Sequence, residues 1–306
     1  MTKRKSRRPT RVDRPSRKQS RVPEFIRRLP RFAKIGIALA IVGVVVAVVL
    51  IAGQPPGDNT GKPRAAIVDQ LYNLQPNDEF VANVTAQLEE YGFEVDLYQG
   101  DDIDVRFYRG LASRGHKLII FRVHAGLVIE NGGVSDRTLL FTNEEYSTSR
   151  YPAEQISDRL AKGSAGEGHP VMFAITPGFI ASSTSMSGAF DDTAIIMMGC
   201  SALYYNDLAR AFIGRGASVY LGWYARVLLH YVDEATPYLL RQLCYEEATI
   251  KEAIIRTMDP DEGIGLDPQY QAALAYYPTD TAGKTLAELL KMTVGTEDET
   301  SAEHGR

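Results

Sequence analysis

Cysteine is scarce in this chain, because only Cys200 and Cys244 occur among 306 residues. More than one disulfide is therefore excluded. Metal-binding patterns are lacking too, since neither His116 nor His169 has a second histidine or a carboxylate at ligand spacing. No glycine-rich phosphate loop follows a predicted strand, and residues 163–166 (GSAG) follow a predicted helix instead. We accordingly expect no metal and no other cofactor.

The charges are segregated along the chain. Residues 1–34 contain 14 Lys and Arg but only two acidic residues, a local net charge of +12. From residue 54 onward, 20 Lys and Arg stand against 36 Asp and Glu, a net charge of −16. The two parts are therefore expected to occupy different electrostatic environments.

Residues 35–53 (IGIALAIVGVVVAVVLIAG) separate these parts and carry no charged or polar side chain. About 20 apolar residues span the ~30 Å hydrocarbon core of a bilayer as a helix. The basic segment before the run is longer, and the run itself more extended, than in a cleaved signal peptide. We therefore predict a transmembrane helix over residues 35–53. Basic residues beside such a helix stay in the cytoplasm, which puts the basic arm 1–34 inside and the later residues outside.

Nucleic acid and anionic lipid are alternative contacts of the basic arm, but a disordered topology signal is the preferred interpretation. The expected partner is the lipid bilayer, through residues 35–53, and no nucleic-acid partner is expected. Residues 54–63 (QPPGDNTGKP) predict a short stalk, because Pro and Gly prevent regular structure. Residues 295–306 are polar and acidic and predict a disordered tail.

Strand-like and helix-like patterns alternate between residues 64 and 294. Strands are predicted at 64–68, 93–98, 117–123, 171–176, 193–198 and 217–221. A hairpin is predicted at 127–142, a loop at 177–187, and helices at 78–91, 104–113, 152–162, 205–214, 232–246 and 249–258. This alternation predicts one α/β domain, with a mostly parallel sheet flanked by helices on both faces.

Two residues at predicted strand ends have the chemistry of a catalytic pair. His124 follows the strand KLIIFRV, and Cys200 follows TAIIMM and one glycine. Ligands of open α/β sheets bind at the carboxyl ends of strands, so the two side chains are expected at one edge. An imidazole near a thiol takes its proton or lowers its pKa, and the helix after Cys200 favours an anion. His116 and His169 each precede a strand and are expected at the opposite edge.

Both segments resemble a known family. Residues 195–223 (IIMMGCSALYYNDLARAFIGRGASVYLGW) resemble the nucleophile segment of the caspase-like cysteine peptidases, the clan of caspases, legumain, clostripain, gingipains, separase and CHAT domains. Residues 118–126 (LIIFRVHAG) resemble the family's apolar strand that ends in His-Gly. The resemblance covers about residues 65–258, and the gingipain and CHAT branches look closest.

The resemblance implies a role for six residues. Cys200 would be the nucleophile and His124 its base or acid. Ala125, which stands where the family has glycine, would form the oxyanion hole with Gly126 through backbone N–H groups. Trp223 would lie at the wall of the substrate pocket unless it is a core residue. Asp207 would offer charge to a substrate unless it only complements a helix N-terminus.

Three hypotheses follow. The first is a membrane-anchored cysteine peptidase that cleaves peptides or proteins outside the membrane with a Cys-His dyad. The second is a catalytically inactive caspase-like ectodomain that binds a protein or peptide partner, in keeping with Ala125. The third is a structural or sensory ectodomain in which Cys200 and Cys244 form a disulfide.

Overall fold

The computed structural model describes residues 61–130, 133–166 and 168–292. The predicted basic arm, the apolar run 35–53, most of the stalk and the acidic tail lie outside these residues. Within the described ranges, no helix combines the length and the apolar character needed to cross a bilayer. The residues from Gly61 onward belong to one compact unit.

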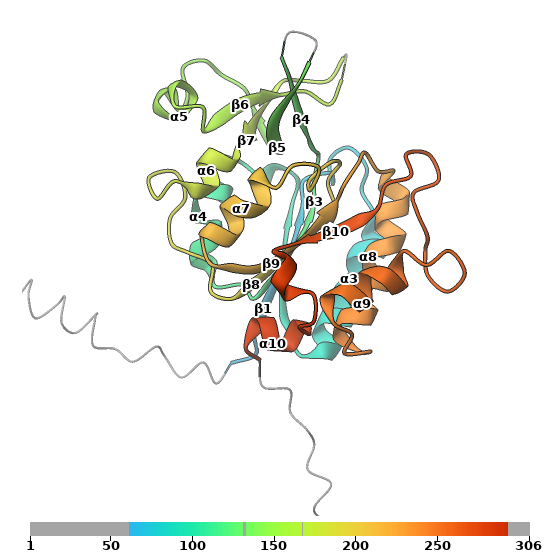
Figure 1. Ribbon diagram of the computed structural model, residues 1–306. Helices are drawn as coiled ribbons and strands as arrows, with labels where there is room; N and C mark the ends of the chain where they lie inside the picture. Colours follow the sequence, from blue (N-terminus) through green and yellow to red (C-terminus); the bar gives the residue numbers. More distant parts are fainter. Residues whose placement is uncertain (1–60, 131–132, 167, 293–306) are drawn as a thin grey trace, which may run out of the picture. The chain divides into compact units, whose positions relative to one another are not determined.

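A six-stranded sheet forms the centre of the domain, in the order β10-β9-β8-β3-β1-β2 (Figure 1). Its strands are β1 (Arg64–Asp69), β2 (Glu94–Gln99), β3 (Leu118–Arg122), β8 (Thr193–Met197), β9 (Ala217–Trp223) and β10 (Leu274–Tyr277). The first five run parallel, and β10 pairs antiparallel with β9. The predicted α/β class with a mostly parallel sheet is confirmed. The edge strand β10 is an addition that the sequence did not predict.

Helices cover both faces of this sheet (Figure 1). One face is covered by α3 (Asp78–Tyr91), α8 (Leu229–Cys244), α9 (Ile250–Thr257) and α10 (Leu286–Leu290). The other face is covered by α4 (Val105–Gly110), α6 (Pro177–Ala181) and α7 (Asp207–Gly214). Helix α6 lies in the segment 177–187 that was predicted to be a loop. Helix α10 lies in a segment for which no helix or strand was predicted.

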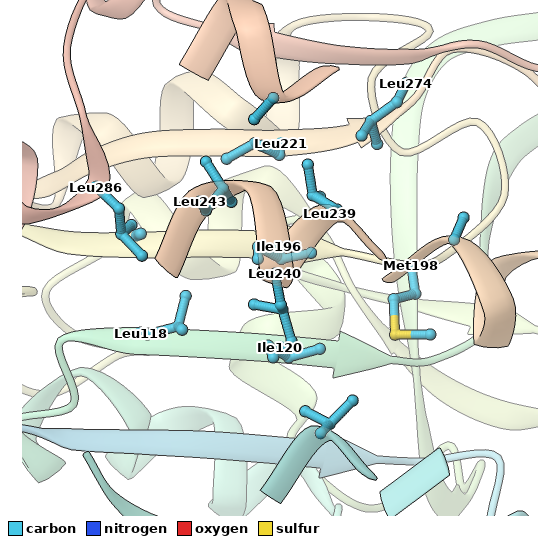
Figure 2. Packing of buried hydrophobic residues seen from close by; sticks show 14 of the residues in the cluster. Leu118, Ile120, Ile196, Met198, Leu221, Leu239, Leu240, Leu243, Leu274 and Leu286 are labelled. Atoms are coloured by element: carbon cyan, nitrogen blue, oxygen red, sulfur yellow. The ribbon is translucent and has the colours of Figure 1, made fainter. Parts of the chain in front are cut away.

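The side chains of the central strands alternate between the two faces. In β3, Leu118 and Ile120 belong to the core cluster under α8, while Ile119 and Phe121 belong to the cluster on the opposite face. Every residue of β3 and β8 is buried, as expected for strands covered on both sides. Figure 2 shows how α8 packs on the sheet through Leu239, Leu240 and Leu243.

A second, antiparallel sheet follows β3 directly, in the order β4-β5-β7-β6 (Figure 1). Its strands are β4 (Ala125–Glu130), β5 (Gly133–Glu145), β6 (Leu160–Gly163) and β7 (Met172–Ile175). The β4–β5 pair confirms the predicted hairpin. The strand predicted at 171–176 exists as β7, but it pairs antiparallel with β5 and β6 in this second sheet, whereas the alternation of strands and helices predicted a mostly parallel sheet.

The helix predicted at 152–162 is wrong at its carboxyl end. Helix α5 (Pro152–Ile156) begins at the predicted proline but ends after five residues. Residues 160–163 instead pair with β7 as strand β6. Gly163 lies against the ring of Phe141, where a Cβ would come within 2.6 Å. Because residues 160–163 gain hydrogen bonds to β7, pairing within the second sheet outweighs the local preference for helix.

Short elements and caps complete the domain. Asn77 caps α3 by accepting a hydrogen bond from the Phe80 N–H, and Gly92 ends the helix in the left-handed conformation. The helix has the predicted bounds, 78–91. The part of the chain that the structure describes contains three 3₁₀ helices, η1 (Gly100–Asp102), η2 (Leu111–Arg114) and η3 (Thr279–Thr281). Of these, η1 follows β2 at the carboxyl edge of the parallel sheet.

Candidate functional site at the carboxyl edge of the sheet

His124 and Cys200 follow two neighbouring strands of the parallel sheet. Phe121 of β3 is in register with Met197 of β8. His124 and Cys200 each come three residues after these paired positions, so both lie at the carboxyl edge. Both line one cavity of about 500 Å³. The expected placement of the two residues at one edge is confirmed, and their chemical roles stay a prediction.

The backbone of His124 is held from two sides. Its N–H donates to the side-chain oxygen of Gln70 at 2.9 Å. Its carbonyl accepts from the N–H of Phe141 at 3.0 Å, and the two ring centroids of this pair are 5.8 Å apart. The amide of Gln70 in turn donates to the Asn143 side chain at 2.7 Å. Hydrogen bonds with β5 and with Gln70, the residue after β1, thus fix the backbone position from which the His124 side chain extends.

The thiol of Cys200 lies beside the backbone of Val227. Its Sγ donates to the Val227 carbonyl at 3.4 Å and accepts from the Val227 N–H at 3.5 Å. The following helix α7 begins only at Asp207, after a turn of several residues. The expectation that this helix N-terminus stabilises a thiolate is therefore not supported, because such an effect fades within one helical turn.

The two cysteines do not form a disulfide. Both are free, and Cys244 is buried at the end of α8 with 4 % of its surface exposed. Burial raises the pKa of Cys244 to about 12. The disulfide hypothesis is wrong for this structure, since Cys200 instead lies in the cavity with His124.

Gly199 permits a close approach between the two strand ends. A Cβ added to Gly199 would stand 2.4 Å from the Cβ of Ala125 and 3.0 Å from the carbonyl oxygen of Val123. Only glycine fits this contact without displacing backbone. The residue before the thiol therefore packs directly against the residue after the imidazole.

The register of the β4–β5 hairpin orients the two peptide groups after His124. Ala125 is opposite Leu140, and Gly126 is opposite Leu139. The Phe141 N–H bonds to His124, and hydrogen-bonded and non-bonded pairs alternate in an antiparallel ladder. The N–H of Ala125 therefore faces away from β5, on the side of Gly199, whereas the N–H of Gly126 faces β5.

A third chemically active side chain joins the cavity. His169 lines it together with His124 and Cys200. The remaining lining residues are Leu71, Leu74, Gln75, Val123, Ala165, Met198, Arg226, Val227, Leu228, Leu229, Val232 and Tyr270. The prediction that His169 lies at the opposite edge is wrong, because β7 belongs to the second sheet, whose loops return to the carboxyl edge. His116 does lie at the opposite edge, where its Nε2 is 2.8 Å from Asp96.

The electrostatic environment of the cavity lowers the pKa of His124. Burial is the larger cause, and the positive charge of His169 is the second. Arg226 adds a further cation and lies over the ring of Tyr270 at 4.8 Å. Within the described ranges, no Asp or Glu side chain lines this cavity. A neutral His124 is consequently favoured, which is the form that accepts a proton.

Two residues proposed from the resemblance lie away from the cavity. The carboxylate of Asp207 accepts from the N–H and the hydroxyl of Thr138 at 2.7 and 2.8 Å, and so ties α7 to β5. Trp223 is 2 % exposed and packs against Tyr231 in the core. Neither is among the residues that line the cavity of His124 and Cys200. Their contacts favour the structural alternative for each.

A buried ionic cluster lies at the carboxyl ends of β1 and β3. Arg122 is 1 % exposed and donates to Asp69 at 2.9 Å and to Asp233 at 2.8 and 3.0 Å. Asn77 also donates to Asp233, at 2.8 Å. The cluster was not identified from the sequence, although charged residues at the ends of two apolar strands were a visible signal.

Comparison of the chain with models of known protein families gives no match, and comparison with curated protein sequences gives none at significant similarity. In the ranges that the structure describes, no three His, Cys, Asp or Glu side chains are grouped to hold a metal ion.

Proposed function

We propose that the chain is a cysteine peptidase of caspase-like type that cleaves peptide bonds with a Cys200–His124 dyad. The observation that carries the proposal is the register of β3 and β8, which brings a free thiol and an imidazole into one cavity. Thiol and imidazole together are the groups that nucleophilic acyl transfer requires.

The chemistry follows from the two groups. His124 takes the thiol proton, and the Cys200 thiolate attacks the carbonyl carbon of the scissile peptide bond. When the C–N bond breaks, His124 returns its proton to the departing amine, and the acyl half stays on sulfur as a thioester. Water, deprotonated by His124, then hydrolyses the thioester and restores the thiol.

The oxyanion formed in this step needs hydrogen-bond donors nearby. The N–H of Ala125 is suited to that role, because it faces away from β5 and lies beside Gly199. The N–H of Cys200 is the natural second donor. Gly126 is less suited, since its N–H faces the β5 ladder. The alanine in place of the family's glycine still supplies a backbone N–H.

The sequence supports a location of the enzyme outside the membrane. The apolar residues 35–53 would anchor the chain in a bilayer, with the basic arm inside and the peptidase domain outside. Protease added to right-side-out vesicles should digest the domain and spare the arm. Protection of the domain with loss of the arm would contradict this orientation.

One observation favours a second candidate, a catalytically inactive domain that binds a peptide. The Cys200 thiol donates to the Val227 carbonyl, an acceptor that competes with His124 for its proton. In this alternative the cavity holds a peptide segment without attack on it. The two candidates differ in one measurable property, the formation of a covalent adduct at Cys200.

The deciding experiment uses acyloxymethyl ketone probes with Arg, Lys, Asp or Asn beside the reactive group. The full chain in detergent should be labelled by at least one probe, and a Cys200→Ala variant should not. A Cys244→Ala variant serves as the matched control and should label like the unaltered chain, since Cys244 is buried. Labelling that persists in Cys200→Ala, or is absent with every probe, favours the binding domain.

A further inference from the structure

The strand order arranges chemically active side chains in a row along the carboxyl edge. The strands β2, β1, β3, β8 and β9 are consecutive neighbours and run parallel. The residues just past their ends are, in the same order, Asp101, Gln70, His124, Cys200 and Arg226. The row therefore has a carboxylate at one end, a guanidinium at the other, and the proposed dyad between them.

A second, smaller cavity of about 100 Å³ lies along this row on the Asp101 side of His124. It shares Leu74, His124, Ala165 and His169 with the larger cavity but is not lined by Cys200. Its lining residues are Gln70, Asn73, Leu74, Asp101, His124, Phe141, Asn143, Ala165, His169, Pro170 and Met172. With about one fifth of the volume of the larger cavity, it suits one side chain rather than a segment of chain.

Acyl transfer assigns the two cavities to different halves of the substrate. The acyl half becomes attached to Cys200 and must occupy the cavity that Cys200 lines. The departing amine receives its proton from His124, so the nitrogen of the first residue of the released half must lie within hydrogen-bond reach of this imidazole. The cavity beyond His124, away from Cys200, is then the place for the first residue of the released half.

The walls of the smaller cavity indicate which residue this is. Phe141, Pro170 and Met172 offer an apolar surface, Asp101 is the acidic residue of the lining, and the imidazoles of His124 and His169 lie on the side shared with the larger cavity. One carboxylate oxygen of Asp101 accepts a hydrogen bond from the Asn73 side chain at 2.7 Å. This neutral amide holds the carboxylate in place without compensating its negative charge. An apolar wall with a carboxylate at its rim matches an alkyl stem that ends in a cation.

We propose that the smaller cavity is a subsite for a lysine or arginine side chain, presented by the first residue after the scissile bond. The inference rests on the proposed peptidase function and adds to it the chemical class of the released half. Asp101 acts here as a specificity residue and takes no part in bond breaking.

The test has two arms on the full chain in detergent. In the first, a peptide library made from a digested proteome is cleaved and the residue after each new cut is read by mass spectrometry. In the second, binding of L-lysinamide and L-norleucinamide to Cys200→Ala is measured by saturation-transfer NMR. Norleucinamide has the same α-amine and a similar alkyl stem, but no side-chain ammonium.

Asp101→Asn is the informative variant, because its side-chain oxygen still accepts from Asn73. Asp102→Asn, at the neighbouring exposed residue outside the cavity lining, is the matched control. We expect Lys and Arg to be enriched after the cut, and lysinamide to bind about fivefold more tightly than norleucinamide, as for a partly exposed ion pair. Both preferences should disappear in Asp101→Asn and persist in Asp102→Asn.

The outcomes separate the two claims. Cleavage without enrichment, or enrichment that survives Asp101→Asn, overturns the subsite and leaves the peptidase standing. A lysinamide preference that depends on Asp101 in a chain that cleaves nothing supports the subsite and rejects the peptidase. Equal binding of the two amides, or no binding at millimolar concentration, overturns the subsite when no cleavage is seen.

Discussion

Gly199 and Ala125 touch across the gap between two strand ends, and a Cβ on Gly199 would lie 2.4 Å from that of Ala125. This contact brings the residue before the thiol against the residue after the imidazole. The spacing of the proposed dyad therefore depends on a glycine that does no chemistry itself.

Replacing this glycine should destabilise the domain. Gly199→Ala is expected to cost about 1 to 3 kcal/mol of unfolding free energy, as for other overpacked interior sites. The added change Ala125→Gly should recover part of the loss, because the carbonyl of Val123 remains 3.0 Å from the new Cβ. Urea unfolding of the full chain measures both.

Gly126→Ala is the matched control for this prediction. A Cβ at Gly126 would meet nothing within 4 Å, so the change should cost much less. Equal costs at the two glycines would contradict the importance of the close contact.

The two cysteines should differ strongly in reactivity. Cys200 lines the cavity beside His124, while Cys244 is 4 % exposed and its pKa is raised to about 12. Iodoacetamide at pH 8 should therefore alkylate Cys200 much faster, as followed by mass spectrometry of the peptides. His124→Gln should slow the reaction at Cys200, whereas His230→Gln, at an exposed position of α8, should not. Equal slow rates at both thiols would argue that Cys200 is not activated.

The acid limb of the pH profile should report His124. Burial and the charge of His169 lower the pKa of His124 below the ordinary histidine value, about 6.5. The neutral imidazole of His124 therefore persists to lower pH than that of an ordinary histidine. His169→Gln removes one cause, so the pKa of His124 should rise and the acid limb of kcat/KM should move to higher pH.

Alkylation of Cys200 as a function of pH gives the same information without a substrate. The control His230→Gln should leave the limb in place. A limb that stays unchanged, or moves to lower pH, in His169→Gln would contradict the electrostatic contact between the two histidines.

The buried cluster around Arg122 should dominate the electrostatic stability of this edge. Arg122→Met leaves Asp69, with no exposed surface, without its cation, and is expected to cost about 3 to 5 kcal/mol. Arg64→Met is the control, because the side chain of Arg64 is 41 % exposed in its pair with Asp96 and should cost about 1 kcal/mol or less. Similar urea midpoints for the two variants would refute this ranking.

The parts of the fold that could be predicted are those with a local cause. Apolar runs of five or six residues identified the central strands, and Asn77 and Gly92 marked the ends of α3. The positions of His124 and Cys200 after two such runs were enough to expect them at one edge, because parallel strands align their carboxyl ends.

What the sequence could not predict depends on pairing between distant residues. Residues 160–163 are too few to distinguish strand from helix, and only pairing with β7 makes them β6. Pairing of β7 with β5 places β7 in the second sheet, and with it His169 in the cavity. Local patterns thus determined the parallel sheet and the edge where chemistry is expected. The second sheet, the buried ions and the third cavity residue were decided by tertiary structure, because hydrogen bonding and charge compensation across the chain fixed them.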